Sequence, residues 1–294
     1  MGWVNWTIGV KPVITKAVIP AAGLGTRLLP ATKEQPKEML PIFSKGADGK
    51  LFLKPFLQVV YEKLYDTGFK EFCFIVGKGK RSIEDHFTID DNFLEFLRTN
   101  NKIELSNELS KFYEKIRNST LVFTNQPRPL GFGNAVYQAR FFTSDEAFMV
   151  HAGDDSIISE KNNHLRRLVR AFEKYEADAA FLVKRVDDPT KYGVILGEKI
   201  GSRVYLVKRI VEKPSTPFSD IGTIAIYIFN SKIYRAIEHT KPDRNNEVQL
   251  TDAIQQLIDQ GCRVYALELN RNEKRIDVGT PESYREAFIV ASNF

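Results

Sequence analysis

The chain has 294 residues, 43% of them hydrophobic and 27% charged, and a mass of 33.6 kDa. This length allows one large α/β domain or two smaller ones, and it can bury enough surface to fold without a metal or disulfide staple. The chain has two cysteines, Cys73 and Cys262, a count that excludes a disulfide framework and a cysteine-rich metal centre. Both lie in apolar runs, which predicts two core residues. The net charge of +5 comes from dispersed basic residues, which do not form a nucleic-acid-binding tract but would suit a small anionic substrate.

No segment of the sequence resembles a membrane span or a secretion signal. The mean hydropathy is −0.27, and no apolar run approaches the ~20 residues that a spanning helix needs. Residues 1–15, which include Trp3 and Trp6, lack a continuous apolar region and a small-residue cleavage site. We therefore expect an N-terminal extension at 1–15, a cytoplasmic location, and neither a membrane nor a nucleic-acid partner.

Strands and helices alternate through the first part of the chain. This rhythm predicts a mostly parallel sheet with helices on both faces. The pairs Phe93/Phe96 and Phe141/Phe142 are expected in the core. Predicted strands lie at 16–22, 71–76, 120–124, 147–151 and 179–184, and predicted helices at 56–67, 81–87, 103–116 (a surface excursion), 133–140 and 165–175.

The rhythm changes after residue 185, where strand-like runs follow one another without a helix. Thr280 is a typical N-cap, with Pro281 at the first position of a terminal helix. No linker-like tract divides the chain, so one domain from 16 to 294 with a small extra β region in its second half is predicted. Here the predicted strands are 193–196, 203–211, 223–229 and 263–269, and the predicted helices 232–238 and 250–260.

The strongest local signal is the glycine-containing turn Ala21-Ala-Gly-Leu-Gly-Thr-Arg27 after the first strand. Its glycines allow the backbone N–H groups to surround a phosphate, with donors added by the Thr26 hydroxyl and the Arg27 guanidinium. The turn matches neither a P-loop nor a dinucleotide fingerprint. An ordinary strand-to-helix turn is the alternative.

A lysine follows on a stiff segment, Pro36-Lys-Glu-Met-Leu-Pro41. The two prolines restrict the backbone, and Met39-Leu40 is an apolar anchor. Lys37 is thus suited to nucleotide phosphates, although a solvated loop lysine would look the same.

Two aspartates lie in turns of the kind that follow a strand. Asp154 follows the apolar strand at 147–151, and Asp277 lies in Ile276-Asp-Val-Gly-Thr280. Open α/β sheets bind ligands at strand ends, and two carboxylates can share one Mg²⁺. Each could instead be a turn or cap residue, and Asp155 could replace Asp154 as the ligand.

Two further places could contact a substrate. Glu212 could accept hydrogen bonds from sugar hydroxyls while Lys213 neutralises a sugar phosphate, although a charged turn pair is the alternative. Gln126 and the Gly131-Phe-Gly133 turn could contact a base, because an amide can read its edge and a glycine admits its flat face.

Taken in order, these pieces resemble the sugar-1-phosphate nucleotidylyltransferases, and more narrowly the bacterial-type UTP–glucose-1-phosphate uridylyltransferases. The resemblance runs from about 16 to about 289, and residues 90–116 match the longer insertion of uridylyl enzymes. The motifs that carry it are Ala22-Gly-Leu-Gly-Thr-Arg27, Pro36-Lys-Glu-Met-Leu-Pro41, Ser82-Ile-Glu-Asp-His-Phe87, Gln126 with Gly131-Phe-Gly, Tyr192-Gly-Val194, Val211-Glu-Lys-Pro214 and Glu247-Val-Gln-Leu-Thr-Asp-Ala-Ile254.

The resemblance implies a Rossmann-like nucleotidyltransferase fold with a mixed, mostly parallel central sheet. Residues 16–185 would bind the nucleotide and residues 186–294 the sugar phosphate. The implied reaction transfers a uridylyl group from UTP to glucose 1-phosphate with Mg²⁺, in a protein that self-associates. The implied site comprises Ala22, Gly23, Leu24, Gly25, Thr26, Gln126 and Gly131 for the nucleotide; Gly193, Glu212 and Lys213 for the sugar phosphate; Asp154 and Asp277 for the metal; and Arg27, Lys37, Asp154, Lys213 and Asp277 for catalysis.

Two motifs depart from the uridylyl pattern. This chain has Gly153-Asp154 where the family usually has Pro-Asp, and Asp277-Val-Gly where it has Asp-Cys-Gly. Both variants resemble the thymidylyl enzymes, so the choice between UTP and dTTP stays open. Galactose 1-phosphate or N-acetylglucosamine 1-phosphate as the sugar substrate, and a non-catalytic nucleotide sensor on the same fold, are the further alternatives.

Overall fold

The computed structural model describes residues 14–46 and 49–293. The expected N-terminal extension, with Trp3 and Trp6, therefore lies almost wholly outside the described residues. In the part that is described, no helix is both long and apolar enough to cross a membrane.

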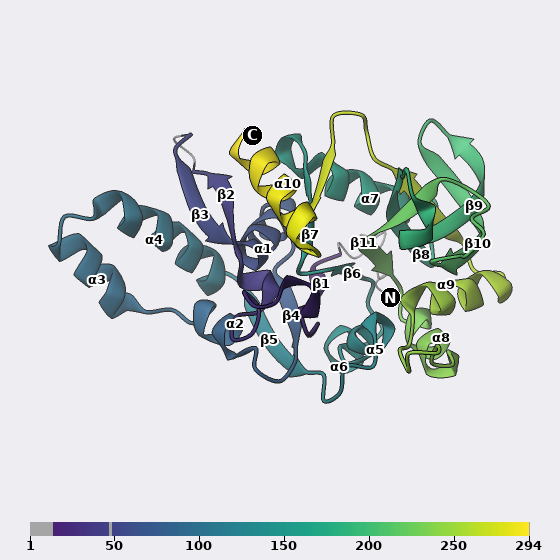
Figure 1. The fold of residues 1–294 in the computed structure, drawn as a ribbon, viewed down its shortest axis with the longest axis horizontal. Coiled ribbons are helices and arrows are strands. Elements are labelled where there is room, and N and C mark those ends of the chain that lie inside the picture. Colours follow the sequence, from purple (N-terminus) through teal and green to yellow (C-terminus); the bar gives the residue numbers. More distant parts are fainter. Residues whose placement is uncertain (1–13, 47–48, 294) are drawn as a thin grey trace, which may run out of the picture.

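A mixed nine-stranded sheet forms the centre of the molecule (Figure 1). Its strands are β1 (Lys16–Pro20), β4 (Glu71–Val76), β5 (Thr120–Asn125), β6 (Phe148–His151), β8 (Ala179–Arg185), β9 (Gly193–Gly201), β10 (Val204–Glu212), β11 (Ile221–Phe229) and β12 (Val264–Glu268). Their order across the sheet is β5-β4-β1-β6-β11-β8-β12-β10-β9. β5, β4, β1 and β6 pair in parallel, as do β8 and β12, whereas β11 and β10 run antiparallel to their neighbours.

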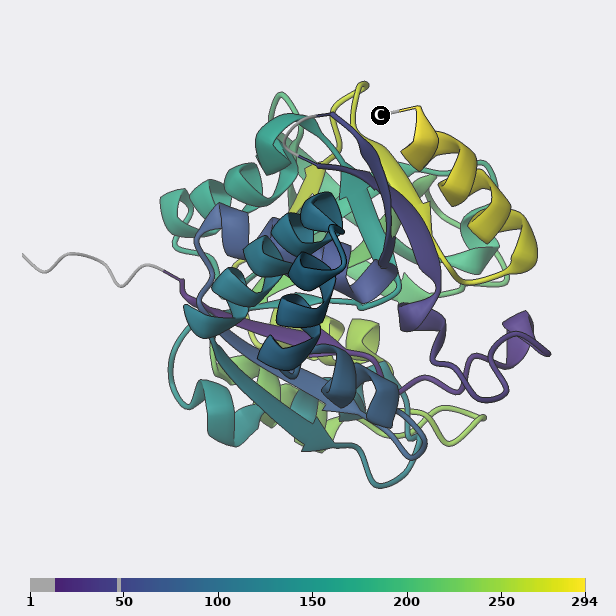
Figure 2. The same ribbon diagram turned by 90° about the vertical axis from the view of Figure 1, so that its left-hand side faces the viewer.

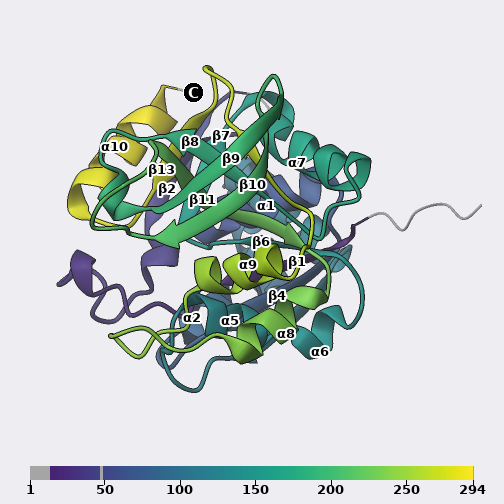
Figure 3. The same cartoon turned by 90° about the vertical axis from the view of Figure 1, so that its right-hand side faces the viewer.

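Helices cover both faces of this sheet, as predicted. Successive residues of a strand point to opposite faces, so Ala17 and Ile19 belong to one buried cluster and Val18 to the other. The first cluster includes residues of α1, α4, α7 and α10, and the second includes residues of α5, α8 and α9; the two layers are separate in Figure 3. The helices are α1 (Phe56–Thr67), α2 (Arg81–His86), α3 (Asp91–Thr99), α4 (Ile103–Arg117), α5 (Phe132–Tyr137), α6 (Arg140–Thr143), α7 (Asn163–Lys174), α8 (Lys232–His239), α9 (Leu250–Asp259) and α10 (Pro281–Ser292).

Two small antiparallel pairs escaped prediction from the sequence. One is the hairpin of β2 (Pro41–Lys45) and β3 (Leu51–Pro55), and the other joins β7 (Asp155–Ile158) to β13 (Lys274–Asp277). Each strand has only four or five residues, too few to show a clear alternation. β7 and β13 are also far apart in the chain, so only the tertiary fold brings them together.

The prediction that the two phenylalanine pairs belong to the core is wrong for three of the four side chains. Phe93, Phe96 and Phe141 are 47%, 58% and 80% exposed. Phe93 and Phe96 lie on α3, which projects with α4 from the body of the molecule (Figures 1 and 2), so no second layer covers them. Phe142 packs at the margin of a buried cluster, Cys73 is fully buried and Cys262 is partly buried.

Candidate active site

The glycine-containing turn leaves β1 with much of its backbone facing solvent. Gly23, Leu24 and Thr26 are exposed, and Gly25 has a φ of 69°, a left-handed conformation that suits glycine. The Thr32 hydroxyl donates to the Gly25 carbonyl at 2.7 Å and closes the loop from its far side. Thr26 and Arg27 then start a short 3₁₀ helix, Thr26–Leu28. The exposed loop therefore carries backbone N–H groups, a hydroxyl and a guanidinium within a few residues of one another.

Lys37 joins this loop to the carboxyl end of β6. It begins a second 3₁₀ helix, Lys37–Met39, and its side chain passes over Gly23, where an added Cβ would lie 3.6 Å from Lys37 Cε. The ammonium group forms an ion pair with the Asp154 carboxylate. Burial alone would lower the pKa of Lys37, but the carboxylates of Asp154 and Glu38 outweigh it and raise that pKa. For Asp154, burial is likewise outweighed by Lys37, so the pKa of Asp154 lies below its usual value.

A buried ion pair lies beneath Lys37. Glu38 is 1% exposed, and its Oε2 accepts a hydrogen bond from Lys80 Nζ at 3.0 Å. Burial raises the pKa of Glu38 even though Lys80 and Lys37 oppose the shift. Lys80 lies 42 positions from Glu38, so only the fold brings the two side chains together.

The two predicted metal-binding aspartates, Asp154 and Asp277, lie side by side although they come from distant segments. We call this place the aspartate edge. Asp277 is the last residue of β13. This strand pairs with β7, which begins directly after Asp154. The Val278 N–H donates to the Asp154 carbonyl at 3.0 Å. Asp277 Oδ1 accepts a hydrogen bond from the Gly279 N–H at 3.0 Å, and an added Cβ at Gly279 would lie 3.6 Å from an Arg27 guanidinium nitrogen.

Asp155, the alternative metal ligand, is engaged elsewhere. It is 2% exposed, and Nε of Arg275 donates to both carboxylate oxygens at 2.9 Å. The same guanidinium reaches within 3.8 Å of Asp277 Oδ2 and lies 5.5 Å from the Tyr192 ring. Arg275, which the sequence did not single out, thus connects the aspartate edge to the loop before Gly193.

The predicted sugar-phosphate residues come together at the paired ends of β9 and β10. Gly193 is opposite Glu212 in the register, and the Lys213 N–H donates to the Tyr192 carbonyl at 3.0 Å. Glu212 accepts a hydrogen bond from the Thr251 hydroxyl at 3.2 Å and pairs with Lys213 Nζ at 3.1 Å. The Lys213 side chain is 60% exposed, which leaves its ammonium group accessible to an anion.

The predicted base-binding residues form a braced turn. Gln126 is buried, and its amide donates to the Gly131 carbonyl at 3.1 Å and to Asn134 Oδ1 at 2.9 Å. The Leu130 carbonyl and the Gly133 N–H bond the Val248 backbone at 2.8 and 2.9 Å. The structure therefore gives Gln126 a bracing contact, and its contact with a base stays a prediction.

These contacts connect the candidate residues into one ring at the carboxyl ends of the parallel strands. The ring runs from Gly23 through Lys37, Asp154, Asp277 and Arg275 to Tyr192, Gly193, Glu212 and Thr251. The chain itself then leads from Thr251 back to Val248, which adjoins Gly131, the residue that Gln126 contacts. Gln126 is tied to Val76 by a 2.7 Å backbone bond, and an added Cβ at Gly77 would lie 3.1 Å from the Ala22 carbonyl oxygen, which closes the ring. The carboxyl ends of the strands are where open α/β sheets bind ligands.

Comparison with known proteins decides the family. The profile described as "Nucleotidyl transferase" matches residues 16–292. The chain belongs to the nucleotidyl transferase family. This confirms the resemblance inferred from the order of the motifs.

Relatives in this family are similar along almost their whole length. The chain is 41% identical over 276 residues to UTP–glucose-1-phosphate uridylyltransferase 2 of Streptococcus pyogenes, covering 90% of this chain and 86% of that protein. It is 34% identical over 279 residues to the UTP–glucose-1-phosphate uridylyltransferase of Pseudomonas aeruginosa, with 94% and 95% covered.

Solved structures agree with this relationship and with the predicted fold. A UDP-glucose pyrophosphorylase complexed with UDP-glucose matches with a TM-score of 0.82 at 32% identity, covering 95% of this chain and 99% of that one. A UTP-bound enzyme of the same name from Acinetobacter baumannii matches with a TM-score of 0.81 at 28% identity, covering 94% and 93%.

Proposed function

We propose that this family member transfers a uridylyl group from UTP to α-D-glucose 1-phosphate and releases UDP-glucose and pyrophosphate. The observation that carries the proposal is the contact of Lys37 with Asp154 beside Asp277, because it joins the glycine-containing turn to a pair of carboxylates. The names of the similar enzymes support the same reaction.

The nucleotide's phosphates are assigned to the first part of the ring. The N–H groups of Gly23–Thr26 and the Arg27 guanidinium would hold the triphosphate and the leaving pyrophosphate, with Ala22 and Leu24 shaping the loop. Lys37 would neutralise charge near the α-phosphate. Because both reactants are anions, positive groups fixed in place before the reaction reduce their repulsion without having to reorganise.

The sugar phosphate is assigned to the opposite side. Lys213 would bind its phosphate, and Glu212 and the Gly193 backbone would bind the sugar hydroxyls. A phosphate oxygen of glucose 1-phosphate then attacks the α-phosphorus of UTP in line, and the bond to pyrophosphate breaks. No covalent intermediate with the protein is needed, so catalysis rests on positioning and charge neutralisation.

The residues present fit a magnesium ion. Asp154 and Asp277 are partly exposed carboxylates at one edge, and Mg²⁺ commonly uses one or two protein carboxylates together with water and substrate phosphate. Across the described ranges, no three His, Cys, Asp or Glu side chains are arranged so that they could hold a metal ion by themselves, so water and substrate phosphate would complete the shell of the ion. When bound, the ion would neutralise charge on the reacting phosphates.

Base selectivity is assigned to Gln126 and Gly131 and is the open part of the proposal. Gly153-Asp154 and Asp277-Val-Gly resemble the thymidylyl enzymes, and a pocket discriminates weakly against one extra methyl group. We expect UTP to be preferred over dTTP. Self-association and a cytoplasmic location also stay predictions; light scattering on the purified protein checks the former.

The decisive experiment measures pyrophosphate release from UTP and, in parallel, from dTTP, each in the presence of glucose 1-phosphate and Mg²⁺. Release with UTP that requires both Mg²⁺ and the sugar phosphate supports the proposal. A higher kcat/KM with dTTP would transfer the assignment to a thymidylyltransferase. Release with neither nucleotide, for glucose, galactose and N-acetylglucosamine 1-phosphates alike, would favour a nucleotide sensor, which a UTP-binding titration then tests.

A further inference from the structure

The strand that follows Asp154 depends on support from outside its own sheet. β7 pairs only with β13 in the described sheets, and a two-stranded sheet is marginally stable by itself. Its position nevertheless matters for the candidate site, because β7 follows Asp154 directly and its register with β13 places Asp155 opposite Asp277. A group that fixes β7 therefore also fixes the aspartate edge.

Lys63 of α1 supplies such a contact. Its ammonium group donates to the Ser156 hydroxyl and to the Ile157 carbonyl, each at 2.9 Å. Ser156 and Ile157 are both 0% exposed. Lys63, itself partly buried, thus binds two successive residues of β7.

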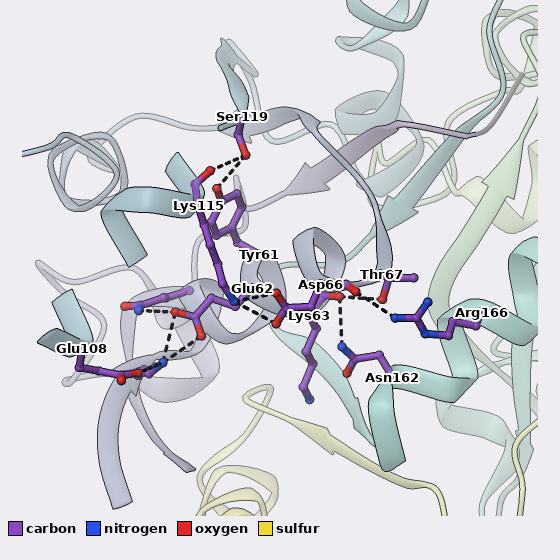
Figure 4. Close-up of polar contacts among 12 residues, drawn as sticks. Tyr61, Glu62, Lys63, Asp66, Thr67, Glu108, Lys115, Ser119, Asn162 and Arg166 are labelled. Atoms are coloured by element: carbon purple, nitrogen blue, oxygen red, sulfur yellow. Dashed lines mark hydrogen bonds and ion pairs between the residues drawn. The ribbon is translucent and has the colours of Figure 1, made fainter. Parts of the chain in front are cut away.

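Among the described residues, the charged neighbours of Lys63 on α1 both form ion pairs, unlike Lys63. Glu62 pairs with Lys54 at 2.9 Å and Asp66 with Lys115 at 2.8 Å, whereas Figure 4 shows the Lys63 side chain pointing away from these charges. Within the described residues, Lys63 forms no ion pair with a carboxylate. Burial lowers the pKa of Lys63 to about 8.

An ammonium group without a counterion in the interior opposes folding, and an apolar side chain would avoid that cost. The contacts that Lys63 makes go to the β7 backbone and to Ser156, so its effect falls on the strand beside Asp154. α1 itself is held on its other sides, since Asn162 Nδ2 donates to the Lys63 carbonyl at 3.2 Å and Arg166 to the Asp66 carbonyl at 3.0 Å (Figure 4). Because α1 is itself held in place by these contacts, Lys63 can position β7 relative to it.

We propose that Lys63 is a positioning residue that clamps β7 to α1 and thereby keeps Asp154 aligned with Asp277. The proposal rests on the proposed function of this edge. It predicts that loss of the clamp affects metal use and turnover more than binding of the sugar phosphate, because Glu212 ends β10 and Lys213 follows it directly, neither being part of β7 or β13.

The test compares Lys63→Met with the wild-type enzyme and with a matched control, Asp66→Asn, three residues further along α1. Hydrogen exchange is measured on a peptide spanning residues 153–160, and kcat, both KM values and the Mg²⁺ concentration for half-maximal rate are measured by pyrophosphate release. In Lys63→Met we expect faster exchange in this peptide. We also expect kcat to fall, and the Mg²⁺ concentration for half-maximal rate to rise, by about tenfold or more each, the usual effect of removing a group that orients a metal ligand. The KM for glucose 1-phosphate should stay within twofold, and Asp66→Asn should match wild type.

Two further variants separate a positioning role from a failure to fold. Lys63→Arg retains a cationic donor and should recover part of the lost turnover. If Lys63→Met does not fold, Ser156→Ala removes one of the two contacts and should shift exchange and Mg²⁺ requirement in the same direction. Wild-type exchange and Mg²⁺ requirement in folded Lys63→Met would overturn the positioning role, whereas lack of turnover in the wild-type enzyme would count against the proposed function instead.

Discussion

The ammonium group of Lys37 forms an ion pair with the carboxylate of Asp154, although 117 positions separate the two residues in the chain. This contact joins the segment after the glycine-containing turn to the end of β6. It places a cation and a carboxylate at the point where the proposed reaction neutralises charge on phosphate.

Replacing Lys37 by alanine should therefore lower kcat by about 10²–10³, the effect typical of losing one fixed electrostatic donor. Steady-state kinetics with UTP and glucose 1-phosphate measure it. Lys33→Ala, on the same segment but exposed, is the matched control and should leave kcat unchanged. Near-normal turnover in Lys37→Ala would show that this lysine serves the structure alone.

Asp154→Ala and Asp277→Ala should each abolish turnover while leaving the fold intact, because each removes one of the two proposed metal carboxylates. Circular dichroism checks the fold, and pyrophosphate release across a Mg²⁺ titration checks turnover. Activity above a tenth of wild type in either variant would contradict a site that needs both aspartates.

Lys213→Ala should raise the KM for glucose 1-phosphate by about tenfold or more, because a charge-assisted hydrogen bond to the sugar phosphate is lost. The KM for UTP should change little. Lys208→Ala, an exposed lysine on β10, is the control. A changed UTP KM with an unaltered sugar-phosphate KM would contradict the assigned role.

Gly131→Ala should destabilise the turn that Gln126 braces and raise the KM for UTP. The φ of 94° is strained for alanine, and the added Cβ would lie 2.8 Å from the Val248 nitrogen. Gly261→Ala is a matched control, with a φ of 78° and no atom within 4 Å of the added Cβ. The control should lose about 1 kcal/mol of unfolding free energy from strain alone. An equal loss in both variants would show that the Val248 contact relaxes without cost.

Stability should also fall as the pH decreases below 6.5, in part because of His151. Burial lowers the pKa of this fully buried side chain to about 4. The unfolded chain binds the proton first, so the stabilisation is complete above the unfolded pKa of about 6.5 and is lost as the pH falls towards 4, a change of about 3 kcal/mol.

His151→Asn, which does not titrate in this range, should show a shallower decline. Urea unfolding at pH 7, 6, 5 and 4 measures the difference between the two proteins, and the carboxylates common to both cancel in that comparison. Parallel declines would mean that His151 is protonated in the folded state as well.

The sequence alone determined the parts of this protein that depend on local pattern. Apolar runs such as 71–76 predicted buried strands, Thr280 and Pro281 predicted the start of α10, and the order of short motifs predicted the family. Each motif or run lies within a few neighbouring residues, and the order of the motifs is read along the chain, so no knowledge of the fold was needed.

Tertiary structure decided which side chains meet. Lys80 bonds Glu38, Arg275 bonds Asp155, and Lys63 bonds Ser156 of β7. These contacts form only because the sheet brings separate segments together. The exposure of Phe93 and Phe96 has the same origin, since the packing of α3 buries Leu94 and Leu97 and leaves the two phenylalanines uncovered. Pairing and burial depend on distances between remote parts of the chain, and local sequence carries no record of those distances.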